Sequence, residues 1–256
     1  PGSAHALVSL PSALHPHRPF LNGTDAVATV SQTSQRLIRK HRLTSKPVHV
    51  ISNAPPQVTT PRDPGQPRQK ALVYMGSFME YKNVETLIEG MRFLPDYRLH
   101  LCSPITPTRR EELLRIAELH QVSADQLIFH NGIEDVDYRQ LLRRATALVT
   151  LSRSEGYGLP VAEAMAEGTP VILSDLEIFQ EIGGVDNPGA LFIQLASAHP
   201  AQQFADQVLD LEDDQVFRTA SQGAVSQAHT FRWEDSAKAL LNLAEDIYQR
   251  RTRRVF

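Results

Sequence analysis

The sequence predicts an α/β fold in which a parallel sheet is covered by helices on both faces. Between residues 71 and 193, short apolar runs alternate with helical segments, which is the order of β-α-β units. The run from Ala147 to Leu151 is almost entirely apolar, as a buried strand of a parallel sheet should be. At 256 residues, 41% of them hydrophobic, the chain can bury one substantial core and part of a second.

A smaller unit is expected ahead of the main sheet, within residues 1–54. Residues 1–23 are rich in proline and histidine and show little regular pattern. The expected elements of this unit are a strand, a helix and a strand, at residues 26–30, 33–41 and 48–51. Five prolines without apolar periodicity then fall within residues 55–70, which predicts a linker.

The main unit is expected to span residues 71–230, followed by a final helix within residues 231–256. Its strands are expected at residues 71–75, 98–102, 127–130, 147–151, 171–173 and 190–193. The helices are expected at residues 84–91, 108–120, 136–144, 160–167, 177–182, 201–211, 214–228 and 233–250. Asn83 is a candidate N-cap. Pro160 suits the first position of its helix, and Gly168 suits the end.

Composition excludes several classes of protein. A formal net charge of −3 offers no basic face for nucleic acid. Cys102, the single cysteine, lies in an apolar stretch and is expected to be buried and reduced. No apolar run approaches the length of a membrane span, and no secretory signal pattern opens the sequence. We therefore expect a soluble cytoplasmic protein, peripheral to a membrane at most.

Two glutamates eight positions apart, Glu155 and Glu163, carry the strongest functional signal. Glu155 lies in a glycine-bearing loop after a buried strand, and Glu163 lies in the first turn of the next helix. Free N–H groups and the dipole at a helix N-terminus attract an anion such as phosphate. Carboxylates accept hydrogen bonds, so they suit sugar hydroxyls on either side of that phosphate. A nucleotide sugar has this shape. The alternative is a loop cap and an ordinary first-turn acid.

This segment resembles the Glu-x7-Glu donor-binding motif of retaining glycosyltransferases with the GT-B fold, the glycosyl transferases group 1, or family 4. The resemblance covers roughly residues 24–250. It implies two Rossmann-like domains with the active site between them. This chain would supply the C-terminal, donor-binding domain and only a remnant of the first, so we expect a fragment. The implied donor-binding residues of the loop and helix are Glu155, Gly156, Tyr157, Gly158, Leu159 and Glu163.

A second loop, Gly76 to Asn83, follows a strand and opens a helix, and it resembles the family's phosphate-binding loop. The resemblance implies that Gly76, Ser77 and Lys82 contact the donor, with Lys82 neutralising diphosphate oxygens. The family usually has an arginine where this chain has Ser77. The Ser77 hydroxyl or Arg153 are the candidates to replace that cationic contact.

Two further motifs follow in the sequence, at residues 130–133 and 135–137. The segment Asn131-Gly132-Ile133 resembles the family's site for the nucleotide base, whereas His130 is interpreted as a strand-end residue. Asp135-Val136-Asp137 matches a metal-chelating Asp-x-Asp, but acids are expected in the first turn of a helix. No metal is therefore expected. Three histidines in the irregular N-terminal segment are interpreted as solvated: His5, His15 and His17.

The resemblance implies transfer of a hexose, mannose or glucose, from a UDP- or GDP-sugar to a hydroxyl with retention of configuration. The acceptor would be a glycan, a lipid-linked molecule or a small molecule. Glu155 and Lys82 are the residues assigned to catalysis, and no cofactor is implied. The alternatives are a non-catalytic nucleotide-sugar binding module, a donor half that needs a separate partner domain, and an epimerase of the same fold.

The final helix is expected to cross back toward the first domain. Its apolar positions would then be partly uncovered in a fragment, which predicts self-association. These positions are Leu240, Leu241, Leu243, Ala244 and Ile247. The basic residues of the tail, from Arg250 to Arg254, complement the helix dipole, and a peripheral contact with anionic lipid is the alternative interpretation.

Overall fold

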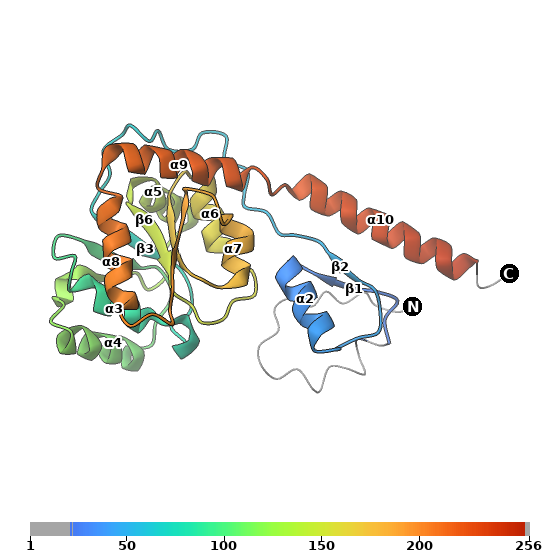
Figure 1. Cartoon of the computed structure of the whole chain (residues 1–256), viewed down its shortest axis with the longest axis horizontal. Helices are drawn as coiled ribbons and strands as arrows, with labels where there is room; N and C mark the ends of the chain where they lie inside the picture. The colour runs from blue at the N-terminus through green and yellow to red at the C-terminus, as the bar shows by residue number, and fades with distance from the viewer. Residues whose placement is uncertain (1–20, 22, 254–256) are drawn as a thin grey trace.

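A computed structural model describes residue 21 and residues 23–253 of the chain (Figure 1). The interpretations of His5, His15, His17 and Arg254 therefore lie outside the described residues. The main unit is built on a six-stranded sheet in which all neighbouring strands are parallel. Its strands are β3 (Ala71–Tyr74), β4 (Arg98–Leu101), β5 (Leu127–Phe129), β6 (Ala147–Thr150), β7 (Val171–Ser174) and β8 (Ala190–Ile193). Their order across the sheet is β5-β4-β3-β6-β7-β8.

Helices cover both faces of this sheet, as the sequence predicts (Figure 1). They are α3 (Val84–Met91), α4 (Pro107–Leu119), α5 (Asp135–Arg144), α6 (Leu159–Ala166), α7 (Glu177–Gly183), α8 (Pro200–Asp210) and α9 (Asp214–Ala228). Two short 3-10 helices, Glu80–Lys82 and Ala124–Gln126, were not expected from the sequence.

Successive side chains of each strand point to opposite faces of the sheet, so a separate core forms on each face. In β3, Leu72 and Tyr74 join one core, in which residues of α3, α4 and α8 pack. Ala71 and Val73 point to the opposite face and join the core packed by residues of α5, α6 and α7. Since both faces are covered, the central strands β3, β6 and β7 are buried along their whole length, which is why they are almost continuous apolar runs in the sequence.

A small unit precedes the main sheet. Strand β1 (Val27–Thr29) pairs in parallel with β2 (Val48–Val50), and α2 (Gln32–Lys40) connects them. Its own core consists of Leu21, Val27, Ile38, Leu43 and Val48. The proline-rich segment then leads from β2 along the main unit to β3 (Figure 1).

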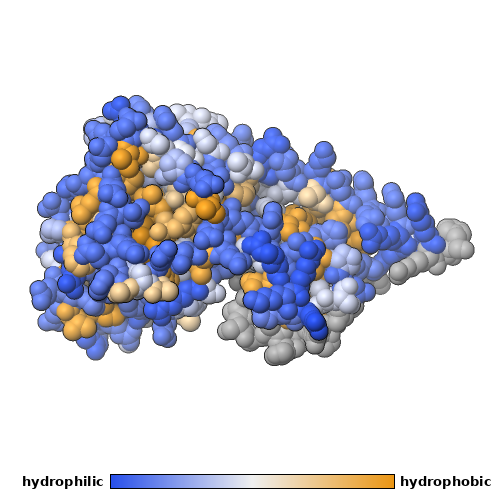
Figure 2. Space-filling view, viewed as in Figure 1, coloured by the Kyte–Doolittle hydropathy of each residue, from blue (hydrophilic) through white to orange (hydrophobic). Residues whose placement is uncertain are grey.

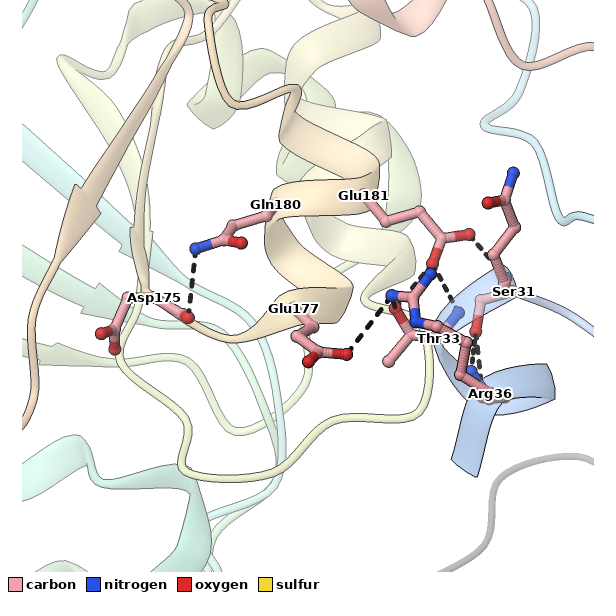
Figure 3. A network of polar contacts seen from close by, with 9 residues as sticks. Ser31, Thr33, Arg36, Asp175, Glu177, Gln180 and Glu181 are labelled. Atoms are coloured by element: carbon pink, nitrogen blue, oxygen red, sulfur yellow. Dashed lines mark hydrogen bonds and ion pairs between the residues drawn. The ribbon is translucent and has the colours of Figure 1, made fainter. Parts of the chain in front are cut away.

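The two units meet where α7 faces the start of α2 (Figure 3). The Glu181 carboxylate accepts hydrogen bonds from the backbone N–H groups of Gln32 and Thr33, at 2.7 and 2.8 Å. It also accepts a hydrogen bond from the Thr33 hydroxyl, at 2.7 Å. Arg36 pairs with Glu177 at 3.3 Å. A carboxylate of one unit therefore satisfies the N-terminus of a helix in the other.

The last helix, α10 (Trp233–Thr252), extends beside the small unit (Figure 1). The Ser236 hydroxyl donates to the Ser52 carbonyl at 2.5 Å, and Arg251 pairs with Asp25. Leu240 and Leu241 remain 54% and 63% exposed, and hydrophobic surface is visible in this region (Figure 2). None of the described helices has the length and apolar character to cross a bilayer. Self-association through α10 stays a prediction.

Packing of the sheet against α9 predicts a large effect at Gly189. A Cβ placed there would lie 2.3 Å from the Ala224 amide nitrogen and 2.7 Å from the Ala220 carbonyl oxygen. Backbone cannot move aside as a flexible side chain can, so Gly189→Ala should destabilise the fold by about 1–3 kcal/mol. Chemical denaturation measures this loss. In Gly65→Ala, the added carbon meets only the Asp63 side chain, so an equal loss in both variants would contradict the packing argument.

Candidate active site

The order of the strands puts the topological switch point of the sheet between β3 and β6, where a crevice is expected in open α/β sheets. From β3 the chain continues to β4 on one side, and from β6 it continues to β7 on the other side. The loops that leave these two neighbouring strands therefore diverge at their carboxyl ends, which is where ligands bind in open α/β sheets. Residues 75–83 and residues 151–158 form these loops.

Lys82 and Glu155, one from each loop, form an ion pair in this crevice. The Lys82 Nζ lies 2.5 Å from the Glu155 Oε2, and their side chains are only 13% and 17% exposed. The Arg153 amide also donates to the Tyr81 carbonyl at 2.7 Å, which joins the two loop backbones. The sequence assigned both charged groups to one site, and the structure brings them into contact.

Asn83 fixes this junction in a way that the sequence did not predict. It stands at the N-cap position of α3, but its backbone is left-handed, with φ 54°, and its side chain makes no capping hydrogen bond. Instead, its amide donates to the Leu151 carbonyl at 3.0 Å, and its oxygen accepts from the Arg153 guanidinium at 3.1 Å. The buried Asn83 thus links the loops and holds Arg153 beside them.

The N-terminus of α6 opens into the same loop system. Its N-cap is Gly158, with φ 100°, a conformation that favours glycine. Pro160 is the second helical residue, one position later than expected, because the helix begins at Leu159. Within the described part of the chain, the amides of Gly158 and Leu159 donate to no acceptor. They are free to bind an anion.

The remaining loop residues are braced by the protein. The Gly76 amide donates to the Ser103 hydroxyl at 3.1 Å, and the Ser77 carbonyl accepts the buried Tyr74 hydroxyl at 2.5 Å. The Ser77 side chain stays exposed. The Tyr157 hydroxyl donates to the Asn53 carbonyl at 2.6 Å, which ties the Glu155 loop to the start of the proline-rich segment.

Glu163 lies in the second turn of α6 and not in the first, because the helix already begins at Leu159. It faces a different cavity, of about 280 Å³, between α5 and α6. The cavity is lined by Pro56, Val58, Asp135, Tyr138, Arg139, Leu142, Glu163 and Glu167. Burial, and then the negative charge of Asp135, raises the pKa of Glu163 above that of a solvated glutamate. Glu163 is thus an acceptor kept in an unfavourable environment, which is unusual for a purely structural acid.

The segment expected at the nucleotide base lines a neighbouring depression of about 680 Å³. Asn131, Gly132 and Ile133 lie there with His100 and His130. The His100 Nδ1 is 3.0 Å from the His130 Nε2. Burial, together with the adjacent His130 and Arg98, lowers the pKa of His100 to about 4, so this ring is neutral at pH 7.

The other residues singled out from the sequence are placed as follows. Asp135 and Asp137 lie in the first turn of α5, where the capping interpretation put them. Cys102 is buried, and burial raises the pKa of its thiol to about 12. No cluster of three or more metal-binding side chains occurs in the part of the chain that the structure describes. Sequence patterns do not identify Tyr138 and His100 as lining residues of these cavities, because no local pattern marks residues that meet across the fold.

The family model for glycosyl transferases group 1 matches residues 60–228. The chain belongs to this family. The serotype-specific mannosyltransferase WbdA of Escherichia coli is 31% identical over 163 residues, which are 61% of this chain and 19% of that protein. The chain therefore spans about a fifth of the length of this curated relative.

Solved GT-B glycosyltransferases share the fold of this family member. The sucrose-phosphate synthase of Thermosynechococcus elongatus superimposes with a TM-score of 0.76 at 22% identity, over 92% of this chain and 61% of that chain. The pneumococcal O-GlcNAc transferase GtfA, solved with UDP and GlcNAc, gives 0.73 at 16% identity, over 96% of this chain and 49% of that one. The expected GT-B family and α/β fold are thereby confirmed.

The environment of Glu163 predicts how stability responds to its removal. A carboxyl whose pKa is raised on folding binds more protons in the native state, so its ionisation lowers stability as the pH rises. Glu163→Gln should therefore raise the Tm at pH 7, and this gain should shrink as the pH falls toward about 4, near the pKa of an unfolded glutamate.

Glu155→Gln is the matched control for this experiment. It removes the charged partner of the poorly exposed Lys82. The free energy of unfolding at pH 7 should therefore fall by about 1–3 kcal/mol, and the Tm should fall with it. Thermal unfolding of both variants across this pH range tests the prediction. A Glu163→Gln protein less stable than the parent at pH 7 would contradict it.

Proposed function

We propose that this chain binds a nucleotide-diphosphate sugar at the crevice between β3 and β6, as the donor-binding part of a retaining hexosyltransferase. The observation that carries the proposal is the Lys82–Glu155 ion pair, because Glu155 lies on the loop that leads into the free N-terminus of α6. A cation and free amides suit a diphosphate, while a carboxylate beside them suits sugar hydroxyls.

The Lys82–Glu155 ion pair explains how two charged groups are tolerated in this poorly exposed site when no ligand is bound. With both side chains poorly exposed, each charge is compensated by the other. A nucleotide sugar offers each of them a new partner, because its phosphate oxygens can accept from Lys82 and its sugar hydroxyls can donate to Glu155. Arg153, held by Asn83 beside this pair, is the candidate for the cationic contact that Ser77 cannot make.

The two glutamates are suited to opposite ends of such a ligand. Glu163 follows Leu159 by one helical turn, about 6 Å along the axis, and faces its own cavity. We assign the ribose hydroxyls to Glu163 and the base to the depression lined by Asn131, Gly132 and Ile133. The diphosphate then passes over the amides of Gly158 and Leu159.

Transfer with retention needs no protein nucleophile in this proposal. The departing phosphate oxygen accepts the proton of the acceptor hydroxyl on the face of the sugar where the new bond forms. The protein then contributes positioning and stabilisation of phosphate charge.

The name of WbdA supports mannose as the transferred sugar, and UDP in the GtfA complex supports a nucleoside diphosphate as the leaving group. The acceptor is a hydroxyl of a glycan, a lipid-linked molecule or a small molecule.

A second candidate function is donor binding without transfer. It is favoured by the location of the assigned site residues, because all of them, from Gly76 to Glu163, lie in the main unit and none is assigned to an acceptor. Holding an acceptor against the donor contributes roughly 7–11 kcal/mol to catalysis, and a facing surface must supply that alignment. Donor binding without turnover across a panel of acceptors supports this candidate, whereas sugar transfer supports the enzyme.

The proposal predicts that binding of GDP or UDP depends on Lys82. Lys82→Ala should weaken it by about 1–3 kcal/mol, the scale of a charge-assisted hydrogen bond. Calorimetric titration in EDTA measures this, since the proposal requires no metal. Lys70→Ala is the control, because Lys70 pairs with Asp96 and Glu212 at the amino end of β3. Equal affinity of the Lys82 variant and the parent, or binding restored only by Mn²⁺, would reject the placement.

Substitution of the two glutamates should weaken the binding of different ligands. Glu163→Gln should weaken free nucleoside diphosphate and nucleotide sugar alike, because both contain ribose. Glu155→Gln should spare the nucleoside diphosphate and weaken only the nucleotide sugar, roughly 10-fold for one lost charged acceptor. Parallel titrations with UDP, UDP-glucose, GDP and GDP-mannose measure the pattern. The same ratio of losses in both variants would show that the ends are misassigned.

A further inference from the structure

Tyr138 carries a buried hydroxyl that the fold does not use. The residue lies on α5, is only 6% exposed and packs in the core between α5 and α6. Within the described part of the chain, its hydroxyl has no hydrogen-bond partner. A phenylalanine would fill the same space without leaving a polar group unsatisfied, so the oxygen needs another explanation.

The surroundings of this hydroxyl belong to the Glu163 cavity. Tyr138 lines that cavity together with Glu163 and Asp135. Burial, and then the charge of Glu163, raises the pKa of the phenol, so Tyr138 keeps its proton and remains a donor. The other charged groups of the lining are occupied, because Glu167 is paired with Arg139 and also with Arg143.

The lining of the cavity therefore includes one acceptor, Glu163, and one donor, Tyr138. The Glu163 carboxylate only accepts hydrogen bonds, while the Tyr138 O–H has no acceptor before a ligand arrives. A sugar hydroxyl can satisfy both at once, since it donates through its hydrogen and accepts at its oxygen. A carboxylate or phosphate of a ligand would meet the charges of Glu163 and Asp135 and be repelled.

We propose that Tyr138 is a specificity-determining residue that donates a hydrogen bond to a ribose hydroxyl held by Glu163. This inference rests on the proposed nucleotide-sugar function and adds a contact to it. Its consequence is selection for ribonucleotides: a ligand that lacks this hydroxyl leaves the phenol unsatisfied and loses a contact to Glu163 as well.

The test is calorimetric titration of Tyr138→Phe with GDP, 2′-deoxy-GDP and 3′-deoxy-GDP, and with the matching uridine nucleotides. Loss of one hydrogen bond should weaken ribonucleotide binding roughly 5- to 10-fold. One of the two deoxynucleotides should bind the parent and the variant equally, which identifies the hydroxyl. Thermal unfolding should show the variant at least as stable as the parent, since no bond in the free protein is lost.

Tyr97→Phe is the matched control. Tyr97 is also buried, but its hydroxyl donates to Glu212 at 3.1 Å, beside the ion pair of Lys70 and Glu212. This control should lose stability and keep its nucleotide affinity. The double variant Tyr138→Phe, Glu163→Gln should lose less affinity than the two single losses combined, because both residues hold one hydroxyl.

The outcomes distinguish a failure of the proposed nucleotide-sugar function from a failure of the Tyr138 contact alone. A parent protein that binds none of these nucleotides rejects the proposed function and this inference with it. A parent that binds them, with a Tyr138→Phe variant of equal affinity, overturns the inference alone. A variant that weakens ribo- and both deoxynucleotides by one common factor also overturns it, because Tyr138 then acts without touching a ribose hydroxyl.

Discussion

The structure depends on one topological constraint, which is that the two adjacent strands β3 and β6 send the chain in opposite directions. Parallel strands need crossover connections. After β3 the chain forms β4 and β5 on one side of the sheet, and after β6 it forms β7 and β8 on the other side. No connection can cover the carboxyl ends of both central strands. The loops there must end in polar groups, and Lys82, Glu155 and the α6 N-terminus are those groups.

The site is assembled from groups that are poorly solvated in the free protein. Glu163 is partly buried beside another acid, Tyr138 keeps an unsatisfied hydroxyl, and two amides of the α6 N-terminus have no acceptor within the described chain. Other contacts offset these unfavourable features. Glu167, only 2% exposed, is held by two arginines of α5, which fixes α5 against α6 beneath the cavity. Rigid support and unsatisfied groups thus occur together, as expected where a ligand completes the hydrogen bonding.

Much of the fold follows from local patterns, and the rest does not. Apolar runs and helix signals located the strands and helices of the described chain, since each is specified by its own residues. The strand order could not be derived in this way, because any two apolar edges can pair. Asn83 has the side chain of a cap, yet its left-handed backbone turns it toward Leu151. The contacts of Tyr138 and of Glu181 join residues distant in sequence, and no spacing rule indicates them.

The contact between α2 and α7 has a mechanical consequence (Figure 3). Glu181 is held by three short hydrogen bonds, and Ser31 already caps α2 from within its own unit. These contacts are directional hydrogen bonds, and water can replace the Glu181 carboxylate at the same donors when the two units separate. The Tyr157–Asn53 bond lies on the loop that carries Glu155. A rotation of the small unit would therefore also move the loop that carries Glu155.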